Sequence, residues 1–328
     1  MINWGVLSTA KIGREKVIPA IQASKYSHIV AIASGNKELA NTIAAQNNIE
    51  QVYGSYEDLL KDAKIEAVYI PLPNHMHVEW AIKALEAGKH VLCEKPIGLN
   101  TAQAEQLFQA SAKKPELKIL EAFMYRFHPQ WLKVKSLISE GVIGKVKTIN
   151  AFFSYYNVDP KNIRNSVLVG GGALMDIGCY CVSFPRFILE TEPVRVIGTM
   201  DLDPEMKIDR MTSGILGFSD GITATFTCST QLMPYQRVNI LGENGRIEVE
   251  IPVNAPIDKV THICVSTKEF SKEFTFDPIN QYTLQVDYFA KAIMDESKND
   301  FPLKDSINNM KVIDAIVKSL RNNDWVEL

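Results

Sequence analysis

The stretch Ile2-Asn3-Trp4-Gly5-Val6-Leu7-Ser8-Thr9-Ala10-Lys11-Ile12-Gly13 combines a short apolar strand, a turn of small residues and the start of a helix. A strand that runs into a helix N-terminus at such a turn is the arrangement that binds the diphosphate of a dinucleotide. The turn occupies the place of a G-x-G-x-x-G sequence but keeps only the last glycine, Gly13. On this stretch alone, an ordinary strand-to-helix turn is as good an interpretation as a dinucleotide site.

The same strand-helix pattern continues to about residue 122. Short β-branched runs alternate with amphipathic stretches, which is typical of βαβ units and a parallel sheet. Several runs are apolar without alternation, as in strands that helices cover on both faces. The predicted strands span residues 2–7, 28–33, 51–53, 67–70, 90–94 and 118–122. We therefore predict an α/β protein whose first domain, residues 1–122, is a Rossmann domain with a doubly wound parallel sheet.

The second half has longer strands separated by turn signals, which predicts an antiparallel sheet. The predicted strands span residues 147–156, 194–200, 211–218, 222–229, 237–241 and 246–251. Helices are expected over residues 129–140, 173–189, 281–295 and 306–322. Residues 123–328 are therefore predicted to form an α+β domain with a large, mainly antiparallel open sheet.

Composition excludes several classes of function. A chain of 328 residues with a net charge of -3 and interspersed signs has no basic stripe, so neither nucleic acid nor a membrane is an expected partner. Its five cysteines are scattered without a C-x-x-C pair, which favours reduced thiols and a cytoplasmic location. The N-terminus lacks a basic region followed by an apolar stretch, so no signal peptide is expected. His75, His77 and His128 have no cysteine or carboxylate at ligand spacing, and no metal site is predicted.

The residues after the second strand favour NADP, with NAD as the alternative. Ser34-Gly35-Asn36-Lys37 lies where a carboxylate usually accepts the adenosine ribose hydroxyls, yet this segment contains no Asp or Glu. Ser34 and Asn36 donate hydrogen bonds and Lys37 supplies a positive charge, all of which suit a 2′-phosphate. The alternative for Lys37 is a solvated residue of the next helix.

Three further motifs carry a family resemblance. Pro71-Leu72-Pro73-Asn74-His75-Met76-His77 and Glu94-Lys95-Pro96 both follow strands at the carboxyl edge of the predicted sheet, where open α/β sheets bind ligands. The third motif runs from Gly170-Gly171-Gly172 through Asp176 to Tyr180. Together, the three motifs resemble those of the Gfo/Idh/MocA oxidoreductase family over nearly the whole chain. Asn162-Ile163-Arg164, the D-x-G-x-Y form and the segment 121–129 are most similar to the branch of the NADP-dependent dihydrodiol and D-xylose dehydrogenases.

The resemblance implies hydride transfer between NADP and a sugar or cyclic vicinal diol. It makes Lys95 the active-site lysine, Tyr180 the acid/base residue and Asp176 a residue that positions the substrate, and it implies a cis Lys95-Pro96 bond. The chemistry is consistent, because a free tyrosine with a pKa of about 10 accepts a proton poorly at neutral pH and a nearby ammonium lowers that pKa. Asp176 and Tyr180, spaced i, i+4, would share one helix face. The structural alternatives are a surface lysine, a core tyrosine and a helix-terminal carboxylate.

The remaining predicted site residues fall into two groups. Arg126, Arg164 and Tyr282 are candidates for the walls of the substrate cleft. For Asn74 and His77, packing at a helix start is almost as good an interpretation as contact with the nicotinamide half. The expected cofactor contacts are Ser8, Thr9, Ala10, Lys11, Ile12, Ser34, Gly35, Asn36, Lys37, Pro71, Leu72, Asn74, His77, Glu94 and Lys95.

The resemblance leaves two alternatives to a dehydrogenase: an NAD(P)-binding regulator of a sugar pathway without turnover, and an NAD-dependent glycoside hydrolase. Both bind the same cofactor on the same fold. The resemblance also implies a homodimer or a higher homo-oligomer that associates through the open sheet face, since an apolar open sheet needs covering.

Overall fold

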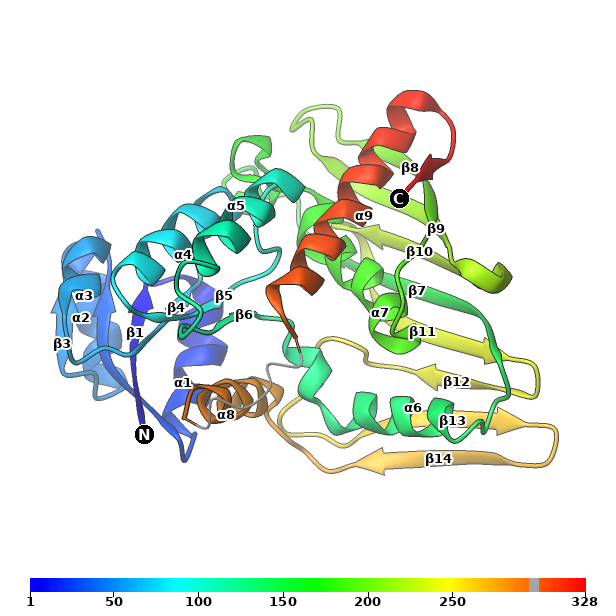
Figure 1. Cartoon of the computed structure of the whole chain (residues 1–328), viewed down its shortest axis with the longest axis horizontal. Helices are drawn as coiled ribbons and strands as arrows, with labels where there is room; N and C mark the ends of the chain where they lie inside the picture. The colour runs from blue at the N-terminus through cyan, green and yellow to red at the C-terminus, as the bar shows by residue number, and fades with distance from the viewer. Residues whose placement is uncertain (295–300) are drawn as a thin grey trace. The chain divides into compact units, whose positions relative to one another are not determined.

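The structure is a computed structural model that describes residues 1–294 and 301–328, and its contacts divide the chain into two compact units (Figure 1). Unit 1 contains Met1–Met124 and the described part of Asn280–Ile307, and unit 2 contains Tyr125–Ile279 and Asn308–Leu328. The sequence had assigned all of residues 123–328 to one domain, whereas helix α8 (Gln281–Met294) packs within unit 1. The predicted end of this helix, Asp295, lies outside the described residues.

Unit 1 is built on a six-stranded parallel sheet in the order β3-β2-β1-β4-β5-β6. The order reverses between β1 and β4, and ligands of open α/β sheets bind at such a switch point. Figure 1 shows α4 and α5 on one face of the sheet and α1 and α8 on the other. The strands are β1 (Ile2–Leu7), β2 (Ser27–Ala33), β3 (Gln51–Tyr53), β4 (Ala67–Ile70), β5 (His90–Cys93) and β6 (Ile119–Glu121), and the helices are α1 (Ile18–Gln22), α2 (Lys37–Gln46), α3 (Tyr56–Lys61), α4 (His77–Glu86) and α5 (Thr101–Ser111).

Local sequence signals explain where these elements begin and end. Ser55 accepts a hydrogen bond from the Asp58 backbone N–H at 3.1 Å and so caps α3. Gly88, with φ +74°, follows the end of α4 in the left-handed conformation that glycine adopts without strain. A π-helical turn (Gly13–Val17) precedes α1, which starts beside Pro19. The predicted Rossmann fold with its parallel sheet is confirmed.

Unit 2 contains a nine-stranded sheet in the order β14-β13-β12-β11-β7-β10-β9-β8-β15. Its neighbouring strands are antiparallel except for β7 and β10, which are parallel, so the predicted mainly antiparallel sheet is confirmed. The sequence analysis missed β13, β14 and β15. The strands are β7 (Val146–Tyr156), β8 (Arg195–Leu202), β9 (Asp209–Gly217), β10 (Thr223–Ser229), β11 (Gln231–Gly242), β12 (Gly245–Val249), β13 (Thr261–Thr267), β14 (Ser271–Phe276) and β15 (Val326–Glu327).

Helices cover one face of this sheet: α6 (Pro129–Ser139), α7 (Cys179–Leu189) and the unit 2 part of α9 (Leu303–Asn322) (Figure 1). Trp131 of α6 stacks on Phe184 of α7 with ring centroids 5.1 Å apart, and both rings are buried. The segment Val167–Leu189 is long and apolar enough by composition to cross a membrane, but 61% of its apolar window is buried inside the protein. Such burial is what a core helix of a globular domain requires.

Candidate functional site

The turn after β1 keeps its shape without the first two glycines of the usual pattern. Ser8 has φ +109°, a conformation that glycine adopts readily and serine rarely does. Its hydroxyl accepts a hydrogen bond from the Ala10 backbone N–H at 3.0 Å, which stabilises the turn from within. Thr9 and Ile12 are half-buried, and Lys11 is exposed. The small side chains leave the turn accessible to a diphosphate.

The turn after β2 meets the turn after β1 through two hydroxyls. Ser34 is buried, and its Oγ lies 3.4 Å from Thr9 Oγ1. Asn36 caps α2, because its Oδ1 accepts from the Leu39 backbone N–H at 3.0 Å. Gly35 and Lys37 are exposed. Ser34 therefore joins the two turns, and Gly35, Asn36 and Lys37 follow it directly in the sequence.

His77 ties together the loops that follow β4 and β5. Its ring is fully buried, with Nδ1 2.8 Å from the Pro96 carbonyl oxygen and Nε2 2.7 Å from that of Leu72. Burial lowers the pKa of His77 to about 4, against the effect of these two carbonyls, so at neutral pH the ring carries one proton and donates to one carbonyl at a time. Pro71 is buried and Asn74 half-buried nearby in the sequence. These contacts support the packing interpretation of His77.

Glu94 organises the end of β5. Its Oε1 accepts a hydrogen bond from the Tyr69 hydroxyl at 2.7 Å, and its Oε2 lies 3.4 Å from the Lys95 backbone nitrogen that donates to it. Lys95 is half-buried, and the Lys95-Pro96 bond is cis, as predicted. Tyr282, predicted as a wall of the substrate cleft, lies in α8 of unit 1. Burial raises the pKa of Tyr282, and the charge of Glu94 raises it further.

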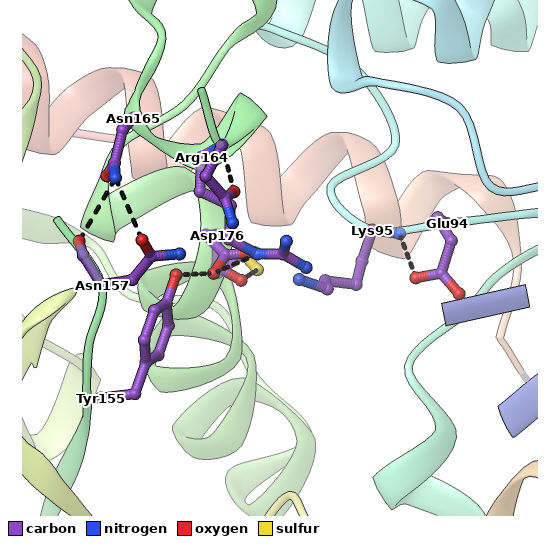
Figure 2. A network of polar contacts seen from close by, with 9 residues as sticks. Glu94, Lys95, Tyr155, Asn157, Arg164, Asn165 and Asp176 are labelled. Carbon is purple, nitrogen blue, oxygen red and sulfur yellow. Dashed lines mark hydrogen bonds and ion pairs between the residues drawn. The ribbon is translucent and has the colours of Figure 1, made fainter. Parts of the chain in front are cut away.

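Asp176 is held by two side chains of unit 2 (Figure 2). The Tyr155 hydroxyl donates to Asp176 Oδ2 at 2.6 Å, and Arg164 Nε lies 3.1 Å from both carboxylate oxygens. The side chain of Asp176 is 12% exposed and that of Arg164 is 42% exposed, so the pair sits at the surface of the unit. Arg164, predicted as a wall of the substrate cleft, contacts Asp176 directly. The sequence analysis missed Tyr155. The one feature of the sequence that could have indicated it is its position among the inward-facing residues of β7.

Tyr180 lies near the start of α7 and faces the same strand as Asp176. Its ring, 4% exposed, is 6.1 Å from that of Phe153 and 6.0 Å from that of Tyr125. Phe153 and Tyr155 are two residues apart in β7 and so point to the same side of the sheet. Asp176 and Tyr180 therefore both face the inner side of β7, as their spacing indicates.

A buried carboxylate supports the beginning of this helical segment. Asp209 Oδ2 accepts from the Leu174 backbone N–H at 2.6 Å and from the Thr212 hydroxyl at 2.9 Å. Burial raises the pKa of Asp209 to about 6, although its hydrogen bonds act in the opposite direction. The chain reaches this position through Gly172, where φ is +109° and a Cβ would lie 1.8 Å from Asp209 Oδ1. Only glycine fits here.

Arg126 occupies a different environment from the predicted cleft wall. It is 5% exposed, and its Nη2 donates to the Ser183 hydroxyl of α7 at 2.7 Å. The Tyr125 hydroxyl shares the same Ser183 oxygen at 2.7 Å. Arg126 therefore braces the middle of α7 within unit 2. In the described part of the chain, no group of three or more His, Cys, Asp or Glu residues is placed to hold a metal ion.

The predicted residues thus form two sets. Unit 1 gathers the diphosphate turn, the β2 turn and the loops after β4 and β5 at the carboxyl edge of its sheet. Unit 2 gathers Arg164, Asp176 and Tyr180 around the inner side of β7. The first set contains hydrogen-bond donors and small side chains, and the second contains a carboxylate, a guanidinium and a phenol.

Comparisons with known proteins agree with this arrangement. The family model "Oxidoreductase family, NAD-binding Rossmann fold" (GFO_IDH_MocA) matches residues 2–121, and the "GFO/IDH/MocA C-terminal domain" matches residues 131–248. The chain is 35% identical to a D-xylose 1-dehydrogenase (NADP(+)) of Haloferax volcanii, over 99% of both chains. It is 34% identical to a trans-1,2-dihydrobenzene-1,2-diol dehydrogenase of Xenopus tropicalis, over 85% of this chain and 83% of the relative.

A solved structure is similar over the same range. A 3-ketoreductase from Actinomadura kijaniata, crystallised with NADP and TDP-benzene, superposes with a TM-score of 0.91. The two chains are 29% identical, and the match covers 97% of each. The likeness therefore extends over both units of the fold.

Proposed function

The chain belongs to the GFO/IDH/MocA oxidoreductase family, and we propose that it is an NADP-dependent dehydrogenase that transfers a hydride between NADP and a sugar or a cyclic vicinal diol. The relatives named for D-xylose and for a dihydrobenzenediol support this substrate class. The observation that carries the proposal is the set of polar groups at the carboxyl edge of the unit 1 sheet, together with the Arg164-Asp176-Tyr155 contacts of unit 2.

The residues of unit 1 fit NADP. The turn from Ser8 to Gly13 leads into a helical turn whose backbone N–H groups would hold the diphosphate. The Ser34 and Thr9 hydroxyls and the absence of Asp and Glu from residues 34–37 suit a 2′-phosphate better than a free ribose hydroxyl. NADP, when bound, supplies the ring carbon that accepts or donates the hydride.

In the proposed reaction, Tyr180 accepts the proton of the substrate hydroxyl and returns it when a carbonyl is reduced. The role proposed for Lys95 is to stabilise the phenolate form of the base and, in the reverse direction, to polarise the carbonyl. Asp176 accepts a hydrogen bond from a second substrate hydroxyl. Tyr155 and Arg164 fix the Asp176 carboxylate, so it can bind the substrate without losing further rotamer freedom.

The test compares Lys95→Met and Tyr180→Phe with the wild type, using a panel of aldoses, inositols and trans-diols with NADP. Loss of the acid/base group lowers kcat by about 10²- to 10⁴-fold, while NADPH binding measured by fluorescence stays within a few-fold. Tyr156→Phe, at an exposed tyrosine of β7, is the matched control. Unchanged turnover in Tyr180→Phe contradicts the proposed roles. NADPH binding without turnover of any substrate in the panel contradicts the dehydrogenase.

We also propose that two copies associate through the open face of the unit 2 sheet. This face carries cross-strand hydroxyl and amide contacts, such as Asn150 to Thr225 at 2.9 Å, beside the Phe152 and Tyr235 rings, 5.5 Å apart. The same sheet face also carries ion pairs, such as that of Arg237 with Glu248. The mixed polar and apolar surface resembles the composition of a protein–protein interface.

The five free cysteines support a cytoplasmic location.

A further inference from the structure

We propose that Arg14 is the cation that binds the 2′-phosphate of NADP, with the Thr9 and Ser34 hydroxyls as its neighbouring hydrogen-bond donors. The proposal rests on the use of NADP proposed above. Rossmann domains that bind NADP usually place an arginine beside the adenosine ribose. Residues 34–37, which follow β2, contain no arginine and only one cation, Lys37, so an arginine for this position would come from another element.

Arg14 is anchored to the adenosine side of the site. It lies on the π-helical turn Gly13–Val17, directly after the glycine that ends the diphosphate turn. Its Nε donates to the Thr9 carbonyl oxygen at 3.1 Å. The hydroxyl of the same Thr9 lies 3.4 Å from Ser34 Oγ, at the end of β2. Thr9 therefore links the guanidinium of Arg14 to the turn where the adenosine ribose is expected.

Most N–H donors of the Arg14 guanidinium make no hydrogen bond to the described residues. Arg14 is exposed, and its bond to Thr9 uses only Nε. Within residues 1–294 and 301–328, neither terminal nitrogen of Arg14 has a protein partner. These nitrogens carry four of the five N–H donors of the side chain, in the forked geometry that matches phosphate oxygens. Anchored at Nε and open at both terminal nitrogens, Arg14 is arranged to bind an oxyanion.

The backbone at Gly35, directly after Ser34, leaves room for a side chain. A Cβ built on Gly35 meets no atom within 4 Å, and the Gly35 backbone is not in the left-handed region. An aspartate at position 35 therefore fits without a collision and would add a carboxylate directly after Ser34. Lys37, exposed at the first residue of α2, adds a second positive charge nearby in the sequence.

The experiment measures the binding of fragments by calorimetry and needs no turnover. Wild type, Arg14→Gln and Lys16→Gln are titrated with 2′,5′-ADP, 5′-ADP, NADPH and NADH. Lys16 is an exposed cation of the same turn and is the matched charge control. We expect Arg14→Gln to weaken 2′,5′-ADP and NADPH by about 10- to 100-fold, the range for charge-assisted hydrogen bonds, and to leave 5′-ADP and NADH unchanged. Lys16→Gln should change none of the four.

A second variant makes the result independent of any local effect at Arg14. Gly35→Asp should weaken 2′,5′-ADP and NADPH and spare 5′-ADP, because a carboxylate repels the 2′-phosphate. The inference is overturned if Arg14→Gln keeps the full preference of the wild type for 2′,5′-ADP over 5′-ADP, or if it weakens all four ligands equally, which would make Arg14 only a support for Thr9. A wild-type protein that binds neither NADPH nor NADH contradicts the proposed function itself.

Discussion

At Gly172, both the backbone conformation and the packing of neighbouring atoms exclude any other amino acid. Its φ of +109° is unfavourable for any other residue, and a Cβ would lie 1.8 Å from the Asp209 carboxylate. Gly172→Ala should therefore lower the free energy of unfolding by more than the ~1–2 kcal/mol of the backbone term alone. It should also lower kcat, because Asp176 and Tyr180 follow on the same helical segment.

Gly141 gives the matched control for this prediction. Its φ is +71°, and no atom lies within 4 Å of a Cβ built there, so Gly141→Ala incurs the backbone cost without a collision. Urea unfolding of both variants separates the two effects. Equal losses of stability would show that the contact between position 172 and Asp209 contributes nothing.

Asp209 makes a pH-dependent contribution to stability. Its pKa is raised to about 6 by burial, so the folded state binds the proton more tightly than the unfolded state. This contribution is fully present below about pH 3.8 and is lost as the pH rises through 6. Asp209→Asn keeps an oxygen for the two donors and does not titrate, so the difference in unfolding free energy between wild type and variant should shift in favour of the variant from pH 4 to 7.

One further variant tests the role of Asp209 as a hydrogen-bond acceptor. Asp209→Ala leaves the Leu174 N–H and the Thr212 hydroxyl without their acceptor and should cost about 1–3 kcal/mol at pH 7. A difference between wild type and Asp209→Asn that stays constant from pH 4 to 7 would contradict the raised pKa.

Sequence motifs indicated the candidate site residues, but they did not indicate the side chains that contact those residues. Lys95, Asp176 and Tyr180 stand in short motifs whose order is recognisable without a structure. Tyr155 and Arg14 stand in no such motif, and their roles depend on contacts made after folding. His77 was given two interpretations from the sequence, and the burial of its ring between two carbonyl oxygens supports the packing one.

At the scale of elements, periodicity predicted the parallel sheet and most of the antiparallel one. β14 was missed because its sequence, SKEFTF, mixes charged residues with two phenylalanines. It also lies at an edge of the sheet, where its outer side pairs with no strand of residues 1–294 or 301–328. The parallel pairing of β7 with β10 leaves no mark in either strand, since it is decided by the connection between them. Local sequence fixes strand identity more firmly than strand order.

His128 is the N-cap residue of α6, with an imidazole in place of the usual capping oxygen. We expect this cap to lose its stabilising effect at acidic pH. Its Nδ1 accepts from the Gln130 backbone N–H at 3.2 Å, which requires an unprotonated nitrogen. Burial lowers the pKa of His128 to about 4, so the unfolded state takes up the proton first as the pH falls. The stabilisation is therefore present above about pH 6.5 and is lost as the pH falls through 4.

His128→Asn keeps a capping oxygen that does not titrate, and should lose less stability than the wild type between pH 7 and 4. His128→Ala should cost about 1 kcal/mol at pH 7.5, the usual value for a lost cap. His75→Asn, at an exposed histidine, is the control for the loss of an imidazole. Chemical denaturation at a series of pH values measures all three, and identical pH profiles for wild type and His128→Asn would contradict the role of the cap.

At the scale of the whole molecule, the chain does not divide at a single point. Helix α8 packs within unit 1 although it follows strands β7 to β14 of unit 2 in the sequence. Ser24 donates to Asp287 at 2.5 Å, and Phe289 packs 5.8 Å from Trp4, which pairs residues more than 260 positions apart. An amphipathic helix shows from its sequence that it needs an apolar partner, but not which one. A domain boundary placed by composition therefore misses such a return of the chain.

The open sheet face of unit 2 leads to a prediction about assembly. Thr225 lies on this face in the middle of β10, where its hydroxyl contacts Asn150 of the neighbouring strand. If two copies associate face to face around a two-fold axis, one substitution enters the interface twice. Thr225→Arg brings two unpaired charges into it and should weaken association by about 10- to 100-fold. Light scattering at micromolar concentration should then show half the mass of the wild type, with NADPH binding unchanged.

Thr42→Arg is the matched control, because Thr42 lies exposed on α2 of unit 1 and is not part of this sheet. It adds the same charge and should leave the mass unchanged. A wild type that is already a monomer at micromolar concentration, or a Thr225→Arg variant that keeps the mass of the wild type, contradicts association through this face. The polar ladders of β7, β9 and β10, such as Ser213 with Thr227 at 2.8 Å, would then need no partner, since their hydroxyls already satisfy one another across the strands.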